Sequence, residues 1–197
     1  MFIYFRNMRI KDEYKQEAII QATVKLVNEI GFVSSSVAKI AFEANVSPAT
    51  IYIYYKNKED LLVSTYVEIK QKLSEALLKN FDDSRPFRDI LKTVWLNGFE
   101  YVAKNRQYYQ YTEQFANSPY SDLVDHATVE KHFEPMLKVL QRGIEQKVIK
   151  NVHHDMLAAF IFYPMMILSN PKLCGALDLT QENIEQAFTL AWDAIKL

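Results

Sequence analysis

Cysteine, glycine and proline are scarce in this chain of 197 residues. The single cysteine, Cys174, excludes an internal disulfide and a metal cluster built on cysteine. Only 4 glycines and 6 prolines interrupt the chain, so the composition favours long helices. The longest apolar run, Met156–Leu168, is shorter than a bilayer-spanning helix and contains Pro164. These absences argue against a disulfide-stapled domain and a membrane span.

A targeting signal is also missing from the pattern. Residues 1–5 are apolar, but the run is too short for a signal peptide and no small-residue cleavage site follows. Hydrophobic residues make up 49% of the chain and charged residues 24%, which is typical of globular proteins. We therefore expect a cytoplasmic protein.

Charge of one sign is not in excess overall, because the net charge is −1. The two parts of the chain differ, however. Residues 1–58 hold eight Lys and Arg residues against five Asp and Glu, a net charge of +3, whereas residues 59–197 carry −4. A basic excess in the first part favours a partner such as nucleic acid, although a solvated helix face produces similar counts.

Apolar residues recur at helical spacing along the whole chain, and no segment has the pattern of a strand. We predict an all-α protein. The expected helices cover about Asp12–Ile30, Val37–Ala44, a short segment from Pro48, Lys58–Phe81, a segment from Phe87, Ser121–Gln146, Asp155–Leu168, and a last helix capped by Thr180. Gly31 is expected to end the first of them as a C-cap.

The segment Val37–Lys58 has the pattern of a helix-turn-helix. Asn45 stands at the turn, where it tolerates a left-handed backbone better than most residues. Ser47 is suited to cap the second helix, and Pro48 to begin it. Hydroxyl groups on that helix can pair with phosphate oxygens and base edges. The alternative from spacing alone is a helical hairpin inside a bundle.

The chain resembles the TetR-type transcriptional regulators, named for the tetracycline repressor. The family pattern covers residues 12–62 and runs through Ile19-Ile20, Ala22, Leu26-Val27, Gly31-Phe32, Ser36-Val37, Ile40-Ala41, Ala44, Val46-Ser47, Thr50-Ile51-Tyr52, Tyr55, Lys58-Glu59 and Leu61-Leu62. Asn45 and Ala49 stand where glycine is frequent, and Tyr54 where histidine is frequent. The departures at Ala49 and Tyr54 concern positions that often meet DNA, so they bear on the operator sequence.

The resemblance implies a helix-turn-helix DNA-binding domain at residues 1–57 and a helical ligand-sensing and dimerisation domain at residues 58–197. It implies a regulator, as a repressor, that binds a palindromic operator as a homodimer and is released by a small, largely apolar or aromatic effector. The residues that it places at double-stranded DNA are Ser36, Lys39, Ser47, Pro48, Ala49, Thr50, Tyr52, Tyr54 and Lys58. Arg9, Lys11 and Lys15 are expected to reach the DNA backbone or the minor groove.

The second domain is assigned two surfaces by the same resemblance. The dimer interface is expected at Phe160, Ile161, Tyr163, Ile167, Phe188 and Trp192, because a monomer would expose this apolar surface. The ligand is expected among aromatic and methionine side chains, which suit flat or flexible apolar molecules. These are Tyr66, Trp95, Phe99, Tyr108, Tyr111, Phe115, Phe133, Met136, Phe162, Met165 and Met166. For each of them, packing in the core is the alternative.

Other functions are weighed against this one. A DNA-binding regulator without a small-molecule effector, an all-α enzyme and a purely structural helical dimer remain as alternatives. Neither a phosphate-binding glycine loop nor a nucleophile motif is present, and no cofactor is expected. His153 and His154 are adjacent, and adjacent residues on a helix point apart, so no metal site is expected there.

Overall fold

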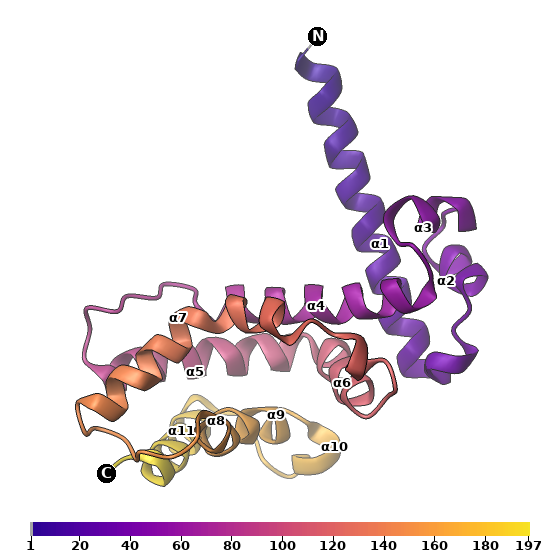
Figure 1. Ribbon diagram of the computed structural model, residues 1–197. Helices are drawn as coiled ribbons and strands as arrows, with labels where there is room; N and C mark the ends of the chain where they lie inside the picture. The colour runs from indigo at the N-terminus through magenta and orange to yellow at the C-terminus, as the bar shows by residue number, and fades with distance from the viewer. Residues whose placement is uncertain (1) are drawn as a thin grey trace. The chain divides into compact units, whose positions relative to one another are not determined.

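The computed structural model describes residues 2–197, with side chains from Glu13 onward (Figure 1). Its elements are α1 (Phe2–Ser34), α2 (Val37–Glu43), α3 (Pro48–Tyr54), α4 (Lys58–Leu77), α5 (Phe87–Lys104), α6 (Arg106–Ala116), the 3-10 turn η1 (Ser121–Leu123), α7 (His126–Glu145), α8 (His154–Ile161), α9 (Tyr163–Leu168), α10 (Pro171–Cys174) and α11 (Gln181–Ile195). The all-α prediction is confirmed; within residues 2–197 the one β-type pairing is an isolated bridge between Ile149 and Lys196. No helix in this described part is long and apolar enough to cross a membrane.

The chain forms two compact units. The first consists of residues 1–69 and 110–124, and the second of residues 70–109 and 125–197. This division differs from the expected domains, residues 1–57 and 58–197, because it falls inside α4 and inside α6. Each of these two helices therefore supplies residues to both units.

The first unit is built around α1, α2 and α3. Gly31 has φ 76 and ψ 168, which interrupts the helical backbone near the end of α1 as expected of a glycine cap. Beyond this break, the Lys58 ammonium donates to the Phe32 carbonyl oxygen at 2.6 Å. The core of this unit consists of Ile19, Ala22, Ile40, Ala41, Ile51, Tyr55 and Leu61, all buried.

The second half of α6 belongs to the first unit because of its aromatic contacts. The Tyr111 hydroxyl donates to the Leu62 carbonyl oxygen at 2.9 Å, and Phe115 stacks on Tyr66 with ring centroids 4.4 Å apart. The ring of Phe32, which follows Gly31, lies 5.7 Å from that of Tyr111. Sequence spacing could not reveal these contacts, since the residues are far apart along the chain.

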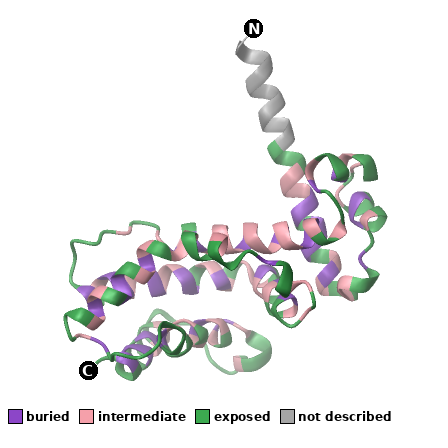
Figure 2. Ribbon diagram, viewed as in Figure 1, coloured by how far each residue is buried: buried purple, intermediate pink, exposed green. Residues whose placement is uncertain are grey.

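The second unit packs α5, α8, α9 and α11 together, and buried residues recur along α5 (Figure 2). The indole of Trp95 donates to the Ile161 carbonyl oxygen at 2.7 Å, which ties the middle of α5 to the end of α8. Gly98 lies so close to its neighbours that an added Cβ would come within 2.7 Å of Leu77 and 2.9 Å of Met165. The approach of α5 to this core therefore depends on the missing side chain.

Several predicted helix limits are wrong, and local chemistry explains them. The segment Asp155–Leu168 is two helices, because Pro164 lies in the first turn of α9 and cannot supply an amide to a continuous helix. The helix predicted from Ser121 begins at His126 instead, where Asp125 caps it by accepting from Ala127 N–H at 3.2 Å. α4 ends at Leu77 rather than Phe81, and Asn80 follows with φ 58. Thr180 caps α11 as predicted.

Candidate nucleic-acid interface

The turn between α2 and α3 has the backbone that the sequence predicts. Asn45 adopts φ 54, a left-handed conformation that asparagine accepts with less strain than most residues. Its N–H donates to the Phe42 carbonyl oxygen at 3.1 Å, and Val46 N–H donates to that of Ala41 at 2.9 Å. Carbonyl oxygens at the end of α2 are thus paired, and the chain is redirected into α3.

The start of α3 is fixed by one capping residue. The Ser47 hydroxyl accepts from Thr50 N–H at 3.1 Å, and Pro48 follows it in the first turn. Ser47 Oγ also lies 2.9 Å from Thr50 Oγ1. These two hydroxyls therefore share one hydrogen bond, and one of their two protons remains to donate elsewhere.

The side chains of α3 divide into a buried and an exposed face. Ile51 is fully buried in the core, whereas Pro48 and Ala49 are exposed. Tyr52 is 56% exposed, whereas a helical hairpin inside a bundle would bury this aromatic side chain in the core. Thr50 and Tyr54 are half-buried, and Tyr54 packs against the core and Tyr55. Tyr54 thus faces outward only in part.

Ile53 was missed among the residues proposed for DNA contact. Its side chain is 78% exposed, more than that of Tyr52. The signal was present in the sequence, because Ile53 lies four residues after Ala49 and residues at that spacing share a helix face.

The basic side chains near α2 are held by the protein itself. Ser36 caps α2 by accepting from Lys39 N–H at 3.3 Å, and Lys39 Nζ donates to the Ser34 carbonyl oxygen at 3.1 Å. Lys58, proposed for a phosphate, uses its ammonium at the end of α1 as described above. An ammonium has three donors, so Lys39 and Lys58 each retain capacity for a phosphate oxygen.

A second contact fixes α2 against α1. Lys25 and Glu43 form an ion pair with 2.6 Å between Nζ and Oε1. The hydrogen bond to this carboxylate raises the pKa of Lys25 above its ordinary value. Lys15 is exposed, while the side chains of Arg9 and Lys11 lie outside the described residues.

The proposed ligand-binding residues are mostly packed rather than open. Trp95, Tyr111 and Phe115 are fully buried, and the remaining buried members are Phe99, Tyr108, Met136 and Met165. Burial raises the pKa of Tyr111 above its ordinary range. Tyr66, Phe133, Phe162 and Met166 are partly buried. The set is also split, because Tyr66, Tyr111 and Phe115 lie in the first unit and the others in the second.

The second unit contains a cavity of 540 Å³ between α7 and the start of α8. Phe133 is the member of the proposed ligand set that lines it. The rest of the wall is formed by Val129, Glu130, Glu134, Leu137, Lys138, Leu140, Gln141, Ile144, His154, Asp155 and Leu157. The volume lies in the range of small-molecule sites. Half of the lining residues are apolar, among them the buried Leu140 and Leu157, and the other half are polar or charged.

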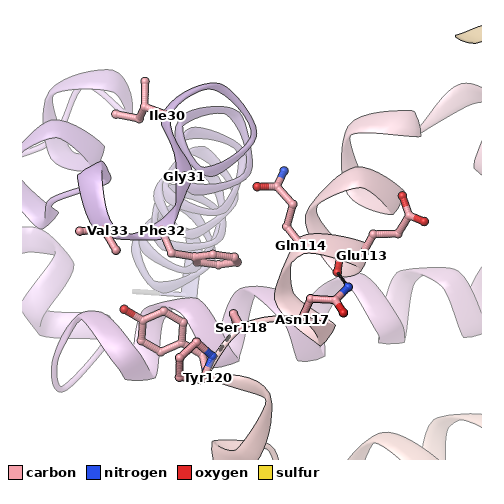
Figure 3. Close-up of a pocket in the computed structure, with 10 residues that line it drawn as sticks. Ile30, Gly31, Phe32, Val33, Glu113, Gln114, Asn117, Ser118 and Tyr120 are labelled. Carbon is pink, nitrogen blue, oxygen red and sulfur yellow. Dashed lines mark hydrogen bonds between the residues drawn. The ribbon is translucent and has the colours of Figure 1, made fainter.

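The first unit has an open cleft of 840 Å³ where α1 ends (Figure 3). The ring of Phe32 lies on one side of it, and Gln114 and Asn117 on the other. One N–H of each amide is paired: Gln114 donates to Asn28 Oδ1 at 3.0 Å, and Asn117 donates to the Glu113 carbonyl oxygen at 2.9 Å. A primary amide also has a second N–H and an acceptor oxygen, so this wall of the cleft is polar and lies opposite the ring of Phe32.

The residues proposed for the dimer interface separate into two groups. Phe160 and Tyr163 are each 57% exposed, and Ile167 is 48% exposed. By contrast, Ile161, Phe188 and Trp192 are buried within the second unit and belong to its hydrophobic core. Leu190 on α11, which was not proposed, is 73% exposed. Phe160 and Leu190 line one pocket together with residues that include Pro164, Leu168 and Ala187.

His153 and His154 lie together, contrary to the expectation that they point apart. Their ring centroids are 4.2 Å apart, and both approach the Asp155 carboxylate. The reason is that His153 is the N-cap of α8 rather than a residue within it. Its Nδ1 accepts from Asp155 N–H at 3.3 Å, so this nitrogen already acts as the helix cap.

Two family models match the chain. The model described as Tetracyclin repressor-like, C-terminal domain, matches residues 86–196, and the model described as Bacterial regulatory proteins, tetR family, matches residues 19–65. Among solved structures, a TetR family transcription regulator from Marinobacter aquaeolei VT8 is 34% identical, with a TM-score of 0.87, and the match covers 95% of this chain and 98% of that chain.

Sequence relatives match over a shorter range. An uncharacterised HTH-type transcriptional regulator of Haemophilus influenzae is 32% identical over 103 residues, 52% of this chain and 55% of that protein. The fatty acid metabolism regulator protein of Bacillus subtilis is 35% identical over 89 residues, 45% of this chain and 46% of that protein. The chain thus spans about half the length of the curated relatives it matches.

Proposed function

The chain belongs to the TetR family of transcriptional regulators, and from that premise we propose that it represses transcription by binding a palindromic operator as a homodimer in the cytoplasm. The family consists of DNA-binding regulators rather than enzymes. The observation that carries the proposal is the exposed face of α3, held in place by the Asn45 turn, the Ser47 cap and the buried Ile51. A bundle hairpin would bury this face instead.

The dimer is supported by the exposed apolar residues of α8, α9 and α11. Phe160, Tyr163, Ile167 and Leu190 would remain in water in a monomer. Phe160 and Leu190 line the same hollow, and contiguous apolar surface of this kind marks an interaction site. A two-fold dimer places two recognition helices about 34–36 Å apart, which matches successive major grooves and requires a palindromic operator.

For the effector we propose the cavity between α7 and α8. Its apolar lining residues, which include Phe133, suit the body of a small, largely apolar or aromatic molecule. Such a molecule releases the operator only if it binds the DNA-free conformation more tightly than the DNA-bound one. α4 and α6 are the helices that supply residues to both units, so they are the elements through which we expect the two binding events to be linked.

A regulator without a small-molecule effector is the second candidate. The observation that favours it is the burial of Trp95, Phe99, Tyr111, Phe115 and Met165, which fill the interior where a ligand was expected. The α7–α8 cavity favours the regulator with a small-molecule effector. The two candidates therefore differ in whether that cavity binds a molecule that changes operator affinity.

The operator is tested first. Selection of bound sequences from a randomised DNA library, followed by fluorescence anisotropy, should give a palindromic site bound by two protomers. Affinity should fall steeply as salt rises, because phosphate contacts release counterions. Failure to select any sequence, with binding that does not respond to salt, would contradict the proposed function.

The effector is tested with N-phenyl-1-naphthylamine, a neutral aromatic fluorescent probe. We expect saturable fluorescence at one probe per protomer and weaker operator binding in its presence. Leu137→Trp, which fills the α7–α8 cavity, should remove both effects while leaving operator affinity without probe unchanged. Unchanged operator affinity with bound probe would favour the regulator without an effector.

A further inference from the structure

The exposed face of α3 carries the apolar side chains of Ala49 and Ile53. The strong contacts to base edges in other DNA-binding proteins come from Arg, Lys, Asn and Gln side chains. We propose that α3 recognises thymine through its C5-methyl group, by apolar contact with Ala49 and Ile53. This inference rests on the proposed DNA-binding function and names the bases that the same surface reads.

The first argument is the chemistry that α3 lacks. Residues 47–54 read S-P-A-T-I-Y-I-Y and include no Arg, Lys, Asn, Gln, Asp or Glu. The strong contacts to base edges are bidentate, from Arg or Lys to guanine and from Asn or Gln to adenine. None of these is available on α3, so the helix has no means of selecting a G·C pair strongly.

The second argument concerns the hydroxyl groups that are present. Ser47 and Thr50 share a hydrogen bond of 2.9 Å, and Ser47 also accepts from Thr50 N–H, which leaves them one proton to donate. The Tyr52 hydroxyl can both donate and accept. Single hydroxyl contacts serve several bases and phosphates alike, so they position the helix more than they discriminate.

The third argument is the apolar ridge formed by Ala49 and Ile53. The two residues are four apart on α3, so their Cβ atoms lie about 5–6 Å from each other on one face. Both are exposed, and Ile53 is 78% exposed. In the major groove the one apolar group on a base edge is the thymine methyl. A ridge of this length reaches methyl groups on neighbouring base pairs, which are about 3.4 Å apart.

The experiment starts from the selected operator and replaces each thymine in turn by deoxyuridine, which removes only the methyl group. One buried methyl-sized group is worth about 0.8 kcal/mol, so each contacted thymine should weaken binding about fourfold. Substitution at symmetric positions of both half-sites should weaken it about 16-fold, since the two losses add. Thymines outside the α3 positions should show no loss.

The variant Ile53→Ala tests whether Ile53 makes one of the proposed thymine contacts. In this variant, deoxyuridine should cost little at the thymine that Ile53 touches and should still cost about fourfold at the others. Phe42→Ala is the matched control, because Phe42 is 87% exposed but lies on α2; it should keep the full deoxyuridine sensitivity. Ile53 is exposed, so its truncation should leave the fold intact.

The outcomes separate the inference from the function on which it rests. A selected operator that binds equally well with deoxyuridine, or one with G·C pairs at the α3 positions, would overturn thymine readout while DNA binding stands. Equal deoxyuridine sensitivity in the wild type and Ile53→Ala would overturn the role of Ile53. If no sequence is selected at all, the proposed function itself fails.

Discussion

The helix-turn-helix of the first unit exposes large apolar side chains, and so does the α8–α11 face of the second unit, which consists of Phe160, Tyr163, Ile167 and Leu190. The residues that surround these side chains differ between the two regions. On α3, Tyr52 and Ile53 stand beside hydroxyls, and residues 1–58 carry a net charge of +3. On the second unit, Phe160 and Leu190 border a hollow lined mostly by apolar residues, and Tyr163 on α9 is exposed as well. The first surface suits a charged partner that offers a few methyl groups, and the second suits another apolar surface.

The two regions also differ in how their geometry is fixed. The α2–α3 turn depends on local chemistry, namely a left-handed Asn45 and the Ser47 cap. The α8–α11 face depends on contacts between distant residues, such as Trp95 with Ile161. A change in the first region should therefore act on base reading, and a change in the second on assembly.

Leu190→Glu should have the largest effect. A glutamate in the middle of the apolar face would place two carboxylates in a dehydrated interface, which costs several kcal/mol. We expect a monomer by analytical ultracentrifugation and at least about a 100-fold loss of operator affinity, because a monomer reads one half-site. Leu123→Glu is the control, since Leu123 is also exposed but lies on η1. A dimeric Leu190→Glu variant would remove this face from the interface.

Gly143→Ala should destabilise the protein by about 1–3 kcal/mol without changing base recognition. A Cβ at this position would lie 2.9 Å from Phe87 Cδ2 and closer still to other ring atoms, so α5 and α7 must move apart. Urea unfolding followed by circular dichroism measures the loss. Phe87→Leu in the same chain should restore part of it, and an additive double variant would contradict the steric explanation.

Ser47→Ala and Thr180→Ala form a matched pair across the two regions. Each residue caps its helix by accepting an N–H three residues later, at 3.1 Å for Ser47 and 3.2 Å for Thr180. Each substitution should cost about 1 kcal/mol in the free energy of unfolding. Only Ser47→Ala should also weaken operator binding, as measured by fluorescence anisotropy. Equal operator losses would mean that the α3 hydroxyls have no part in DNA contact.

Alkaline pH should weaken the first unit gradually. Burial raises the pKa of Tyr55 to about 12, whereas an unfolded tyrosine titrates near 10. Between pH 10 and 12 the unfolded chain releases this proton and the folded chain retains it, so stability falls by up to about 1.4 kcal/mol per pH unit. Below pH 10 the contribution is fully present. Tyr55→Phe should show a shallower decline in urea unfolding from pH 9 to 11.5; an identical decline would argue against this origin.

Sequence patterns captured the recognition segment well. The sequence correctly predicts the left-handed backbone of Asn45 and the roles of Ser47 and Pro48 at the start of α3, because each depends on the preferences of one residue and its near neighbours. Gly31 and Thr180 followed the same rule. Ile53 was overlooked, although its spacing from Ala49 placed it on the exposed face.

The same patterns were less informative for the second unit. The sequence shows that Phe160, Ile161, Phe188 and Trp192 are apolar. Helical spacing cannot tell which of them pack against another helix of the same chain. Aromatic and methionine residues were proposed to surround a ligand, yet most of them fill the core. Apolar character is common to a core, a cavity wall and an interface, so composition cannot separate these places.

The amino-acid sequence by itself determined that this chain is helical, where its reading helix begins and which family it resembles, because capping, turn formation and helical periodicity act over a few residues. Tertiary structure alone decided which apolar side chains remain exposed and that α6 contributes to both units. These features depend on contacts between residues far apart in the chain, where close packing and unpaired hydrogen-bonding groups select one arrangement from many.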